Sequence, residues 1–90
     1  MTIEPAGERL SVVWAPQARN ELRSIDCETA LQIPYCLDRF LTHRSGDIKK
    51  LSPPLEGYRL RCGDYRLFFD FREANSIEIL TVRHRKQAYR

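Results

Sequence analysis

The chain has 90 residues, which allows one folded domain and excludes a second. Hydrophobic residues make up 42% and charged residues 30%, a balance typical of a globular domain and not of a disordered chain. The apolar runs are too short for a membrane-spanning helix, and the N-terminus lacks a secretion signal. We therefore expect one cytoplasmic domain over residues 1–90, with residues 1–9 as a loose leader and no membrane partner.

Positive charge is concentrated in the second half of the chain. The formal net charge is +3; residues 1–45 carry five cations and six acids, whereas residues 46–90 carry ten cations and six acids. Twelve of the fifteen cations are arginines, whose planar fork suits phosphate and carboxylate groups. This excess favours an anionic partner, and the alternative is a solvated face with a basic tail.

The three cysteines are Cys27, Cys36 and Cys62. Their number is odd and none of them forms a C-x-x-C pair. We therefore expect neither a disulfide framework nor a zinc site, and interpret all three as small core or surface residues.

The first part of the chain predicts a strand followed by a helix. Residues 10–14 are rich in β-formers and predict a short strand. A helix is expected to open at Pro16, because proline is tolerated in a first helical turn. Its apolar residues Ala18, Leu22 and Ile25 share one helical face.

A second helix is expected to begin at the N-cap Asp26 and to run to Thr42. Proline removes a helical hydrogen bond and disfavours the α conformation before it, so we expect a kink or a break at Ile33–Pro34. We expect Gly46 to cap the C-terminal end. The two helices should form a hairpin whose apolar faces point inward.

From Tyr58 the hydrophobic pattern changes from the helical period to the alternation of a strand. Strands are expected over residues 58–62, 65–71 and 76–82. The order β-α-α-β-β-β predicts an α+β fold: a helical hairpin packed on a twisted antiparallel sheet, followed by a short basic C-terminal segment. The residues expected in the core include Trp14, Phe40, Phe69 and Phe71.

The dipeptide Gly63-Asp64 is a two-residue hairpin turn and fixes the register of the strands beside it. The pairs are Cys62 with Tyr65, Arg61 with Arg66, Leu60 with Leu67, Arg59 with Phe68 and Tyr58 with Phe69. The apolar partners then share one face and the arginines the other.

Directly opposed arginines repel, so the pair Arg61–Arg66 costs stability unless an acid such as Asp64 or Asp70 lies nearby. The functional interpretation is an anion site. RNA suits it, because phosphates bind arginines and a base can stack on Phe68.

Three segments of the sequence resemble the RelE/ParE toxin superfamily: GDIKKL at 46–51, YRLRCGDYRLFF at 58–69 and TVRHRKQAYR at 81–90. The resemblance covers nearly the whole chain. It implies a small α+β domain and a toxin of a type II toxin–antitoxin pair, silenced by an antitoxin in a hetero-oligomer.

The superfamily implies two activities. RelE-like members cleave mRNA, usually in the ribosomal A site and without a metal, and ParE-like members inhibit DNA gyrase without nuclease activity. We expect a RelE-like endoribonuclease without a cofactor, acting on mRNA and the ribosome. The gyrase inhibitor is the alternative, and a member without toxicity is a third possibility.

The resemblance also implies site residues. Arg59 and Arg61 match a basic pair that is lysine in the ribonuclease prototype, and Arg66, Arg85 and Tyr89 match its arginines and C-terminal tyrosine. Two departures are a shorter spacing from Arg85 to Tyr89, and Arg83 in place of a glycine.

Arginine cannot transfer a proton near neutral pH, so it can only stabilise charge. The titrating candidates for acid and base are His84, Tyr89 and Lys86. His84 and Tyr89 each have a structural alternative. The expected catalytic residues are Arg61, Arg66, Arg85, Tyr89 and His84. The expected RNA-binding residues are Arg59, Lys49, Lys50, Phe68, Arg83 and Lys86, although both lysines also fit a solvated surface.

Overall fold

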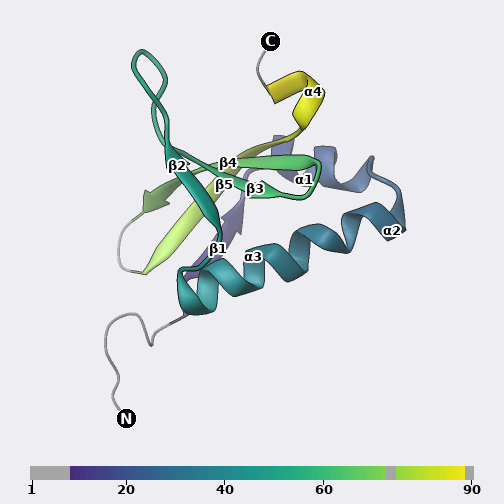
Figure 1. Cartoon of the computed structure of the whole chain (residues 1–90), viewed down its shortest axis with the longest axis horizontal. Helices are drawn as coiled ribbons and strands as arrows, with labels where there is room; N and C mark the ends of the chain where they lie inside the picture. The colour runs from purple at the N-terminus through teal and green to yellow at the C-terminus, as the bar shows by residue number, and fades with distance from the viewer. Residues whose placement is uncertain (1–8, 73–74, 89–90) are drawn as a thin grey trace.

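The computed structural model describes residues 9–72 and 75–88. Its elements are β1 (Ser11–Trp14), α1 (Pro16–Arg23), α2 (Cys27–Ala30), α3 (Gln32–His43), β2 (Asp47–Lys50), β3 (Tyr58–Cys62), β4 (Tyr65–Arg72), β5 (Ser76–His84) and α4 (Arg85–Ala88). Figure 1 shows helices α1 and α3 against a twisted sheet, as the α+β prediction required. The expected leader, apart from Arg9, lies outside the described residues.

The sheet has five strands in the order β1-β5-β4-β3-β2. Strands β3 to β5 form the predicted antiparallel meander, and β2 adds a further antiparallel strand beside β3. Strand β1 pairs parallel to β5, which makes the sheet mixed. Strand β2 was not predicted. Its four residues include a single apolar side chain, that of Ile48, so no alternating apolar pattern indicated a strand here.

The predicted register of the hairpin β3–β4 is confirmed at all five pairs. Gly63 has a φ of 61° at the first turn position, as a type II′ turn requires. This conformation favours glycine because it has no side chain to clash.

The pairing of β4 with β5 contains an irregularity that the sequence interpretation missed. Phe68 lies opposite Thr81 and Phe69 opposite Ile79, so Leu80 is an extra residue and forms a β-bulge. A bulge reverses the alternation of the strand beyond it. Val82 therefore takes the buried side of the sheet, and Arg83 falls on the opposite face.

The helical segment breaks earlier than predicted. Asp26 caps α2 as expected and accepts hydrogen bonds from the N–H groups of Glu28 and Thr29. The break, however, lies at Leu31 and not at Ile33–Pro34. Pro34 then falls in the first turn of α3, where its missing N–H group sacrifices no helical hydrogen bond.

The end of α3 also differs from the prediction. Arg44, with a φ of 57°, takes the left-handed cap position, and its N–H group donates to the carbonyl of Phe40. Gly46 lies two residues further on with a φ of 139°. Its conformation belongs to the connection into β2 and not to the helix cap.

The core lies between α1, α3 and the sheet. Its largest fully buried members are Ile33, Phe40, Leu41, Leu60, Cys62, Leu67, Phe69, Ile77 and Ile79. Phe40 and Phe69 confirm the prediction, and Trp14 packs partly buried against the cluster. The prediction of Phe71 as a core residue is wrong: its ring packs edge-on against Tyr58 and Phe69 but is 44% exposed.

The prediction of three unpaired cysteines is wrong for two of them. Cys36 on α3 and Cys62 at the end of β3 form a disulfide, with Cα atoms 5.7 Å apart. Only Cys27 is free, and it is exposed. The pairing depends on α3 packing under β3, which the spacing of cysteines along the chain does not reveal.

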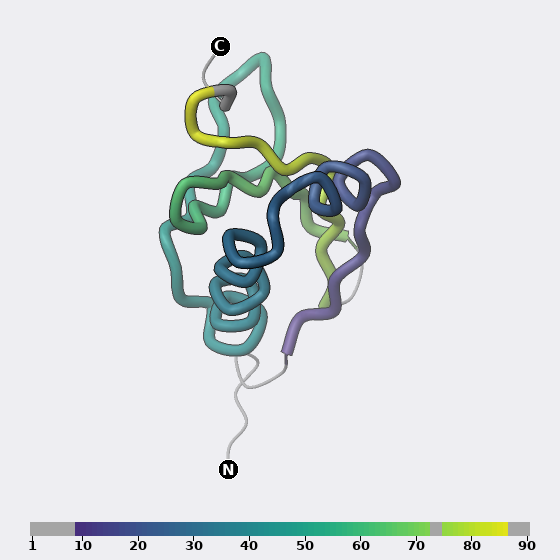
Figure 2. The backbone as a smooth tube through the Cα atoms, turned by 90° about the vertical axis from the view of Figure 1, so that its right-hand side faces the viewer, coloured from purple at the N-terminus to yellow at the C-terminus, as the bar shows by residue number. Residues whose placement is uncertain are grey.

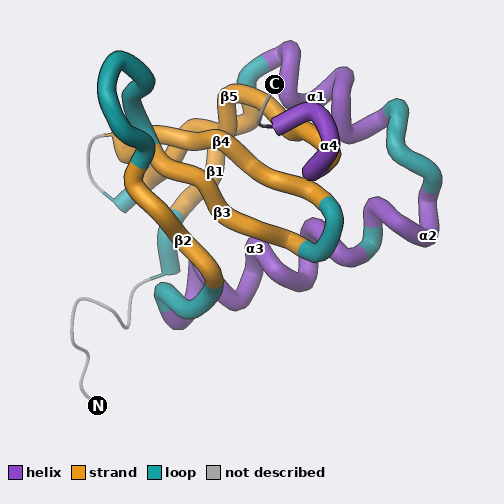
Figure 3. Tube along the Cα trace, turned by 45° about the horizontal axis from the view of Figure 1, so that its top comes forward, coloured by secondary structure: helices purple, strands orange, loops and turns teal. Residues whose placement is uncertain are grey.

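The two faces of the sheet have different surroundings. Figure 2 shows α3 nearly end-on below the sheet, while the β2–β3 loop and the C-terminal segment rise on the opposite side. In Figure 3, α4 lies over the end of β5 and the β2–β3 loop stands at the other side of the sheet. We call the sheet face between them, opposite α3, the outer face.

The burial of Phe69 predicts how much this ring stabilises the fold. Phe69→Ala should lower the free energy of unfolding by about 3–5 kcal/mol, because it leaves a cavity where a ring is now 1% exposed. The control Tyr35→Ala, at a position that is 70% exposed, should change it by about 0.5 kcal/mol or less. Urea unfolding of both variants measures the difference, and equal losses would contradict this assignment of the core.

Candidate nucleic-acid interface

Three arginines lie in one row across the outer face. Arg66 on β4 is directly opposite Arg61 on β3 and directly opposite Arg83 on β5. Side chains opposite each other in antiparallel strands point to the same side of the sheet. The row therefore places three guanidinium groups side by side, an arrangement that is unfavourable without negative charge.

The acids near this row differ from those expected. Asp64 lies 3.7 Å from Arg85 and Asp70 lies 3.8 Å from Arg72, so neither serves the row. Asp47 lies 3.7 Å from Arg61, but both side chains are more than half exposed. An exposed ion pair of this kind contributes little, so the positive charge of the row remains largely uncompensated.

Arg66 is the buried member of the row, only 5% exposed. Its Nη1 donates hydrogen bonds to the carbonyls of Gly63 and Tyr65, at 2.9 Å and 3.1 Å. Its Nε is buried and makes no hydrogen bond to any described residue. A buried donor without an acceptor is costly, so Arg66 adds to the unfavourable energy of the row.

A second row lies beside the first. Lys49 is paired with Arg59, and Arg59 with Phe68. A cavity of about 160 Å³ opens here at the base of the β2–β3 loop, and we call it the Phe68 pocket. Its lining residues are Lys49, Lys50, Leu51, Ser52, Leu55, Arg59 and Phe68.

Two of the three apolar residues of this pocket, Leu51 and Leu55, were not predicted as site residues. Leu55 is 63% exposed, in a loop that also contains Pro53 and Pro54. The sequence alone could have pointed to Leu55, because it is a large apolar residue in a segment that cannot form a regular strand or helix. The pocket combines apolar walls with cations, as a site for a base and its phosphate would.

Helix α4 brings further cations to the same end of the sheet. Arg85 donates its N–H group to the carbonyl of Asp64, and its Nε lies 3.7 Å from the Asp64 carboxylate. Arg85 and Lys86 are both exposed. The turn Gly63-Asp64 therefore supports Arg66 through one carbonyl and Arg85 through the next.

His84 is not part of this arrangement. It is paired with Tyr65, its ring meets the Tyr65 ring edge-on at 5.2 Å, and its Nδ1 accepts a hydrogen bond from Lys86 N–H. Together with Glu21 and Asp26 it lines a cavity of about 300 Å³ on the helix side of the sheet. The structure thus separates His84 from the arginine row.

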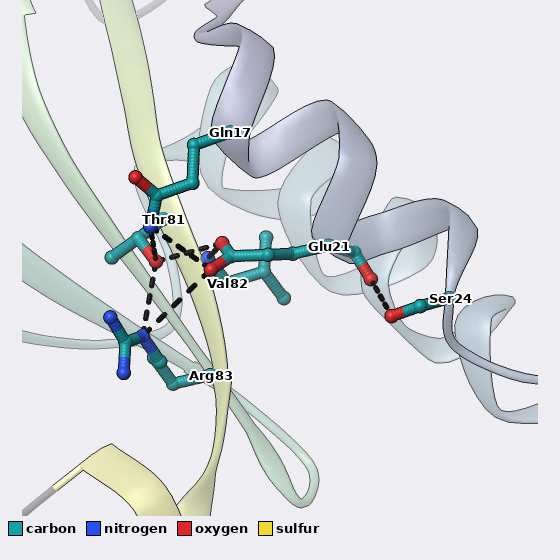
Figure 4. A network of polar contacts seen from close by, with 6 residues as sticks. All are labelled: Gln17, Glu21, Ser24, Thr81, Val82 and Arg83. Atoms are coloured by element: carbon teal, nitrogen blue, oxygen red, sulfur yellow. Dashed lines mark hydrogen bonds and ion pairs between the residues drawn. The ribbon is translucent and has the colours of Figure 1, made fainter.

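A carboxylate from α1 fixes the end of β5 (Figure 4). Strand β1 pairs with β5 only as far as Ile79. Past that point, the Val82 N–H group donates to Glu21 Oε1 at 2.7 Å, and the Thr81 hydroxyl donates to the same oxygen at 2.7 Å. Gln17 donates to the other oxygen, Oε2, at 3.1 Å, and Arg83 Nε lies 3.9 Å from it. Arg83 also donates to the Thr81 hydroxyl at 3.2 Å, which anchors this end of the row.

These contacts determine the ionisation of Glu21. Burial raises its pKa, but the hydrogen bonds from Val82, Gln17 and Thr81, together with the charge of Arg83, outweigh burial. The pKa of Glu21 therefore lies below its ordinary value, and the carboxylate stays charged at neutral pH.

The structure thus brings together, on the outer face and its rim, most of the predicted site residues: Lys49, Arg59, Arg61, Arg66, Phe68, Arg83, Arg85 and Lys86. Lys50 joins them at the wall of the Phe68 pocket. Tyr89 lies outside the described residues.

Within residues 9–72 and 75–88, no three His, Cys, Asp or Glu side chains gather where a metal ion could bind. No helix in that part of the chain has the length and apolar character needed to cross a membrane.

Residues 12–89 match the family described as ParE toxin of type II toxin–antitoxin system, parDE. Since the match spans most of the sequence, the chain belongs to this toxin family of the RelE/ParE superfamily. No curated relative matches the chain.

Solved structures agree with this fold. The toxin–antitoxin complex RelBE2 from Mycobacterium tuberculosis is similar with a TM-score of 0.75 and 22% identity, covering 86% of this chain and 92% of that one. The archaeal RelE–RelB complex from Pyrococcus horikoshii OT3 gives 0.70 and 24%, covering 89% and 99%. The YoeB dimer from Staphylococcus aureus gives 0.63 and 24%, covering 84% and 97%.

The Glu21 contacts predict a pH dependence. A carboxyl group with a lowered pKa stabilises the fold above its ordinary pKa, here 4.5, and loses that contribution as the pH falls through the lowered value. Glu21→Gln should therefore be less stable than the parent at neutral pH, with a difference that shrinks in acid.

Urea unfolding of the parent and Glu21→Gln at a series of pH values measures this difference. A gap that stays constant from neutral to acidic pH would show that the charge of Glu21 contributes nothing.

Proposed function

We propose that this toxin is an endoribonuclease that binds mRNA on its outer face and cleaves it without a metal. The observation that carries the proposal is the arginine row, in which Arg66 lies directly between Arg61 and Arg83. A phosphate at this row would accept from Arg66 and neutralise the repulsion between the three guanidinium groups.

The arginines suit the charge changes of RNA cleavage. Attack of a 2′-OH on the adjacent phosphate adds negative charge to the phosphate oxygens in the transition state. Preorganised cations near those oxygens stabilise that charge, and removal of one such donor typically costs about 10²–10³ in rate. Arg61, Arg66 and Arg85 are proposed for this role.

The Phe68 pocket would hold a base next to the cleaved phosphate. Phe68 offers a ring for stacking, and Leu55 gives a second apolar wall. Arg59, Lys49 and Lys50 border the same space and would contact the backbone of the RNA. Arg83 and Lys86 extend the cationic surface toward α4.

A base and an acid are also needed. The proposal assigns proton transfer to Tyr89, because it matches the C-terminal tyrosine of the RelE-like ribonucleases. His84 is proposed in a structural role, because its ring packs on Tyr65 on the helix side of the sheet.

The proposed partners are a cognate antitoxin and the ribosome with its mRNA. The similar structures from Mycobacterium tuberculosis and Pyrococcus horikoshii OT3 are both toxin–antitoxin complexes. A hetero-oligomer in which an acidic or extended antitoxin segment covers the cationic outer face would silence the activity. The cytoplasm is the proposed location, because translation takes place there.

A gyrase inhibitor without nuclease activity is the second candidate, and the match to the ParE toxin family favours it. On this alternative the arginine row would dock on gyrase or on its bound DNA. The cations would then contribute to binding alone, and loss of Tyr89 would have little effect.

One culture experiment separates the two functions. The chain is induced without an antitoxin, and primer extension on a reporter mRNA and plasmid supercoiling are read from the same cells. New mRNA ends within translated codons, reduced about 10²–10³-fold by Arg66→Gln or Arg85→Ala and lost in Tyr89→Phe, would support the ribonuclease. Intact mRNA with growth arrest and altered supercoiling would support the gyrase inhibitor.

The Phe68 pocket gives a separate prediction. Phe68→Leu keeps an apolar side chain but removes the ring. The free energy of binding to a short RNA, made uncleavable by 2′-O-methyl groups, should therefore become less favourable by about 1–3 kcal/mol. The matched control is Phe71→Leu, on the same strand but on the helix side of the sheet. Fluorescence anisotropy measures both, and an equal loss in the two variants would argue against stacking on Phe68.

A further inference from the structure

The disulfide Cys36–Cys62 has a specific place relative to the arginine row. Cys62 is the last residue of β3 and directly precedes the turn Gly63-Asp64. Cys36 lies on α3, in the layer below the sheet. The bond is therefore a covalent tie between the helix layer and the tip of the β3–β4 hairpin.

The tip that this bond holds is the part of the fold that supports two proposed site residues. The carbonyl of Gly63 accepts from Arg66 Nη1 at 2.9 Å. The carbonyl of Asp64 accepts from the N–H group of Arg85 at 2.7 Å. A shift of this turn relative to α3 would therefore move both supports at once.

The two sulfurs differ in accessibility. Cys62 is 1% exposed, whereas Cys36 is only partly buried. A reductant can reach the Cys36 side, and thiol–disulfide exchange proceeds by attack of a thiolate on an accessible sulfur. Disulfides of proteins that work in reducing compartments are commonly redox-sensing.

We propose that the Cys36–Cys62 disulfide is a redox-responsive lock on the arginine site. When oxidised, it holds the β3–β4 tip, and with it Arg66 and Arg85, in the anion-binding arrangement. When reduced, the tip is held by non-covalent contacts alone, and the competent arrangement is less populated. The effect on RNA rests on the proposed function, but the effect on the tip does not.

The chemistry needs a dithiol reductant as co-reactant. Its first thiolate attacks Cys36 Sγ, forms a mixed disulfide and releases Cys62 as a thiolate, which takes up a proton. Its second thiol, after losing a proton, attacks the reductant's own sulfur in the mixed disulfide and releases Cys36, which is protonated in turn. The protein gains two electrons and two protons, and the dithiol becomes a disulfide.

The lock is tested on the full chain in its oxidised and reduced forms, prepared with oxidised and reduced dithiothreitol. Alkylation followed by mass spectrometry should count one reactive thiol in the oxidised protein, that of Cys27, and three in the reduced protein. Three reactive thiols after oxidation would overturn the proposal, because the bond would not form.

The state of the tip is read from the NMR signals of the arginine Nε–H groups, which need no ligand. On reduction the signals of Arg66 and Arg85 should shift or broaden, while those of Arg23 at the end of α1 should stay unchanged. Cys36→Ser should reproduce the reduced spectrum under oxidising conditions, and Cys27→Ser should behave as the parent. Unchanged Arg66 and Arg85 signals would overturn the lock.

The affinity for a 2′-O-methyl RNA of a few nucleotides is measured in the same two states. If the competent arrangement falls to between a third and a tenth of the molecules, the affinity should fall about three- to tenfold on reduction. Equal affinity in both states would overturn the control of binding. Arginine signals that respond to reduction, in a protein that binds no RNA in either state, would uphold the lock and contradict the proposed function instead.

Discussion

The site depends on one constraint, the register of the hairpin β3–β4. A two-residue turn at Gly63-Asp64 leaves only one pairing that puts the apolar side chains of both strands against the helices. The same pairing forces Arg61 and Arg66 to lie opposite each other on the outer face. The core thus gains its packing from a register that creates repulsion on the other side of the sheet.

The bulge at Leu80 extends this constraint to β5. Without the extra residue, Arg83 would point toward the helix layer; with it, Arg83 completes the row beside Arg66. Glu21 then satisfies the Val82 N–H group that β1 leaves unpaired, and lies close enough to Arg83 to offset part of its charge. The fold therefore tolerates repulsion between the arginines at the centre of the row and offsets their charge only at its two ends, through Asp47 and Glu21.

The sequence was sufficient to predict the α+β fold, the hairpin register and most of the cations of the outer face, because alternation and a short turn act locally. It was insufficient wherever the outcome depended on tertiary packing. The disulfide requires α3 beneath β3, and the separation of His84 from the row requires the bulge. The sequence did contain a sign of the bulge. The apolar residues Ile77 and Ile79 are two positions apart, but the next buried residue, Val82, follows three positions later, so the strict alternation of a regular strand is interrupted.

The central claim is that the arginine row binds phosphate groups of RNA. It is tested most directly by the unfolding temperature of the purified protein with and without a 2′-O-methyl trinucleotide, at fixed ionic strength. A ligand that binds only the folded state raises this temperature. The account predicts a rise for the parent that disappears in Arg66→Gln and persists in the control Arg23→Gln on α1. An equal rise in Arg66→Gln, or no rise in the parent, would contradict it.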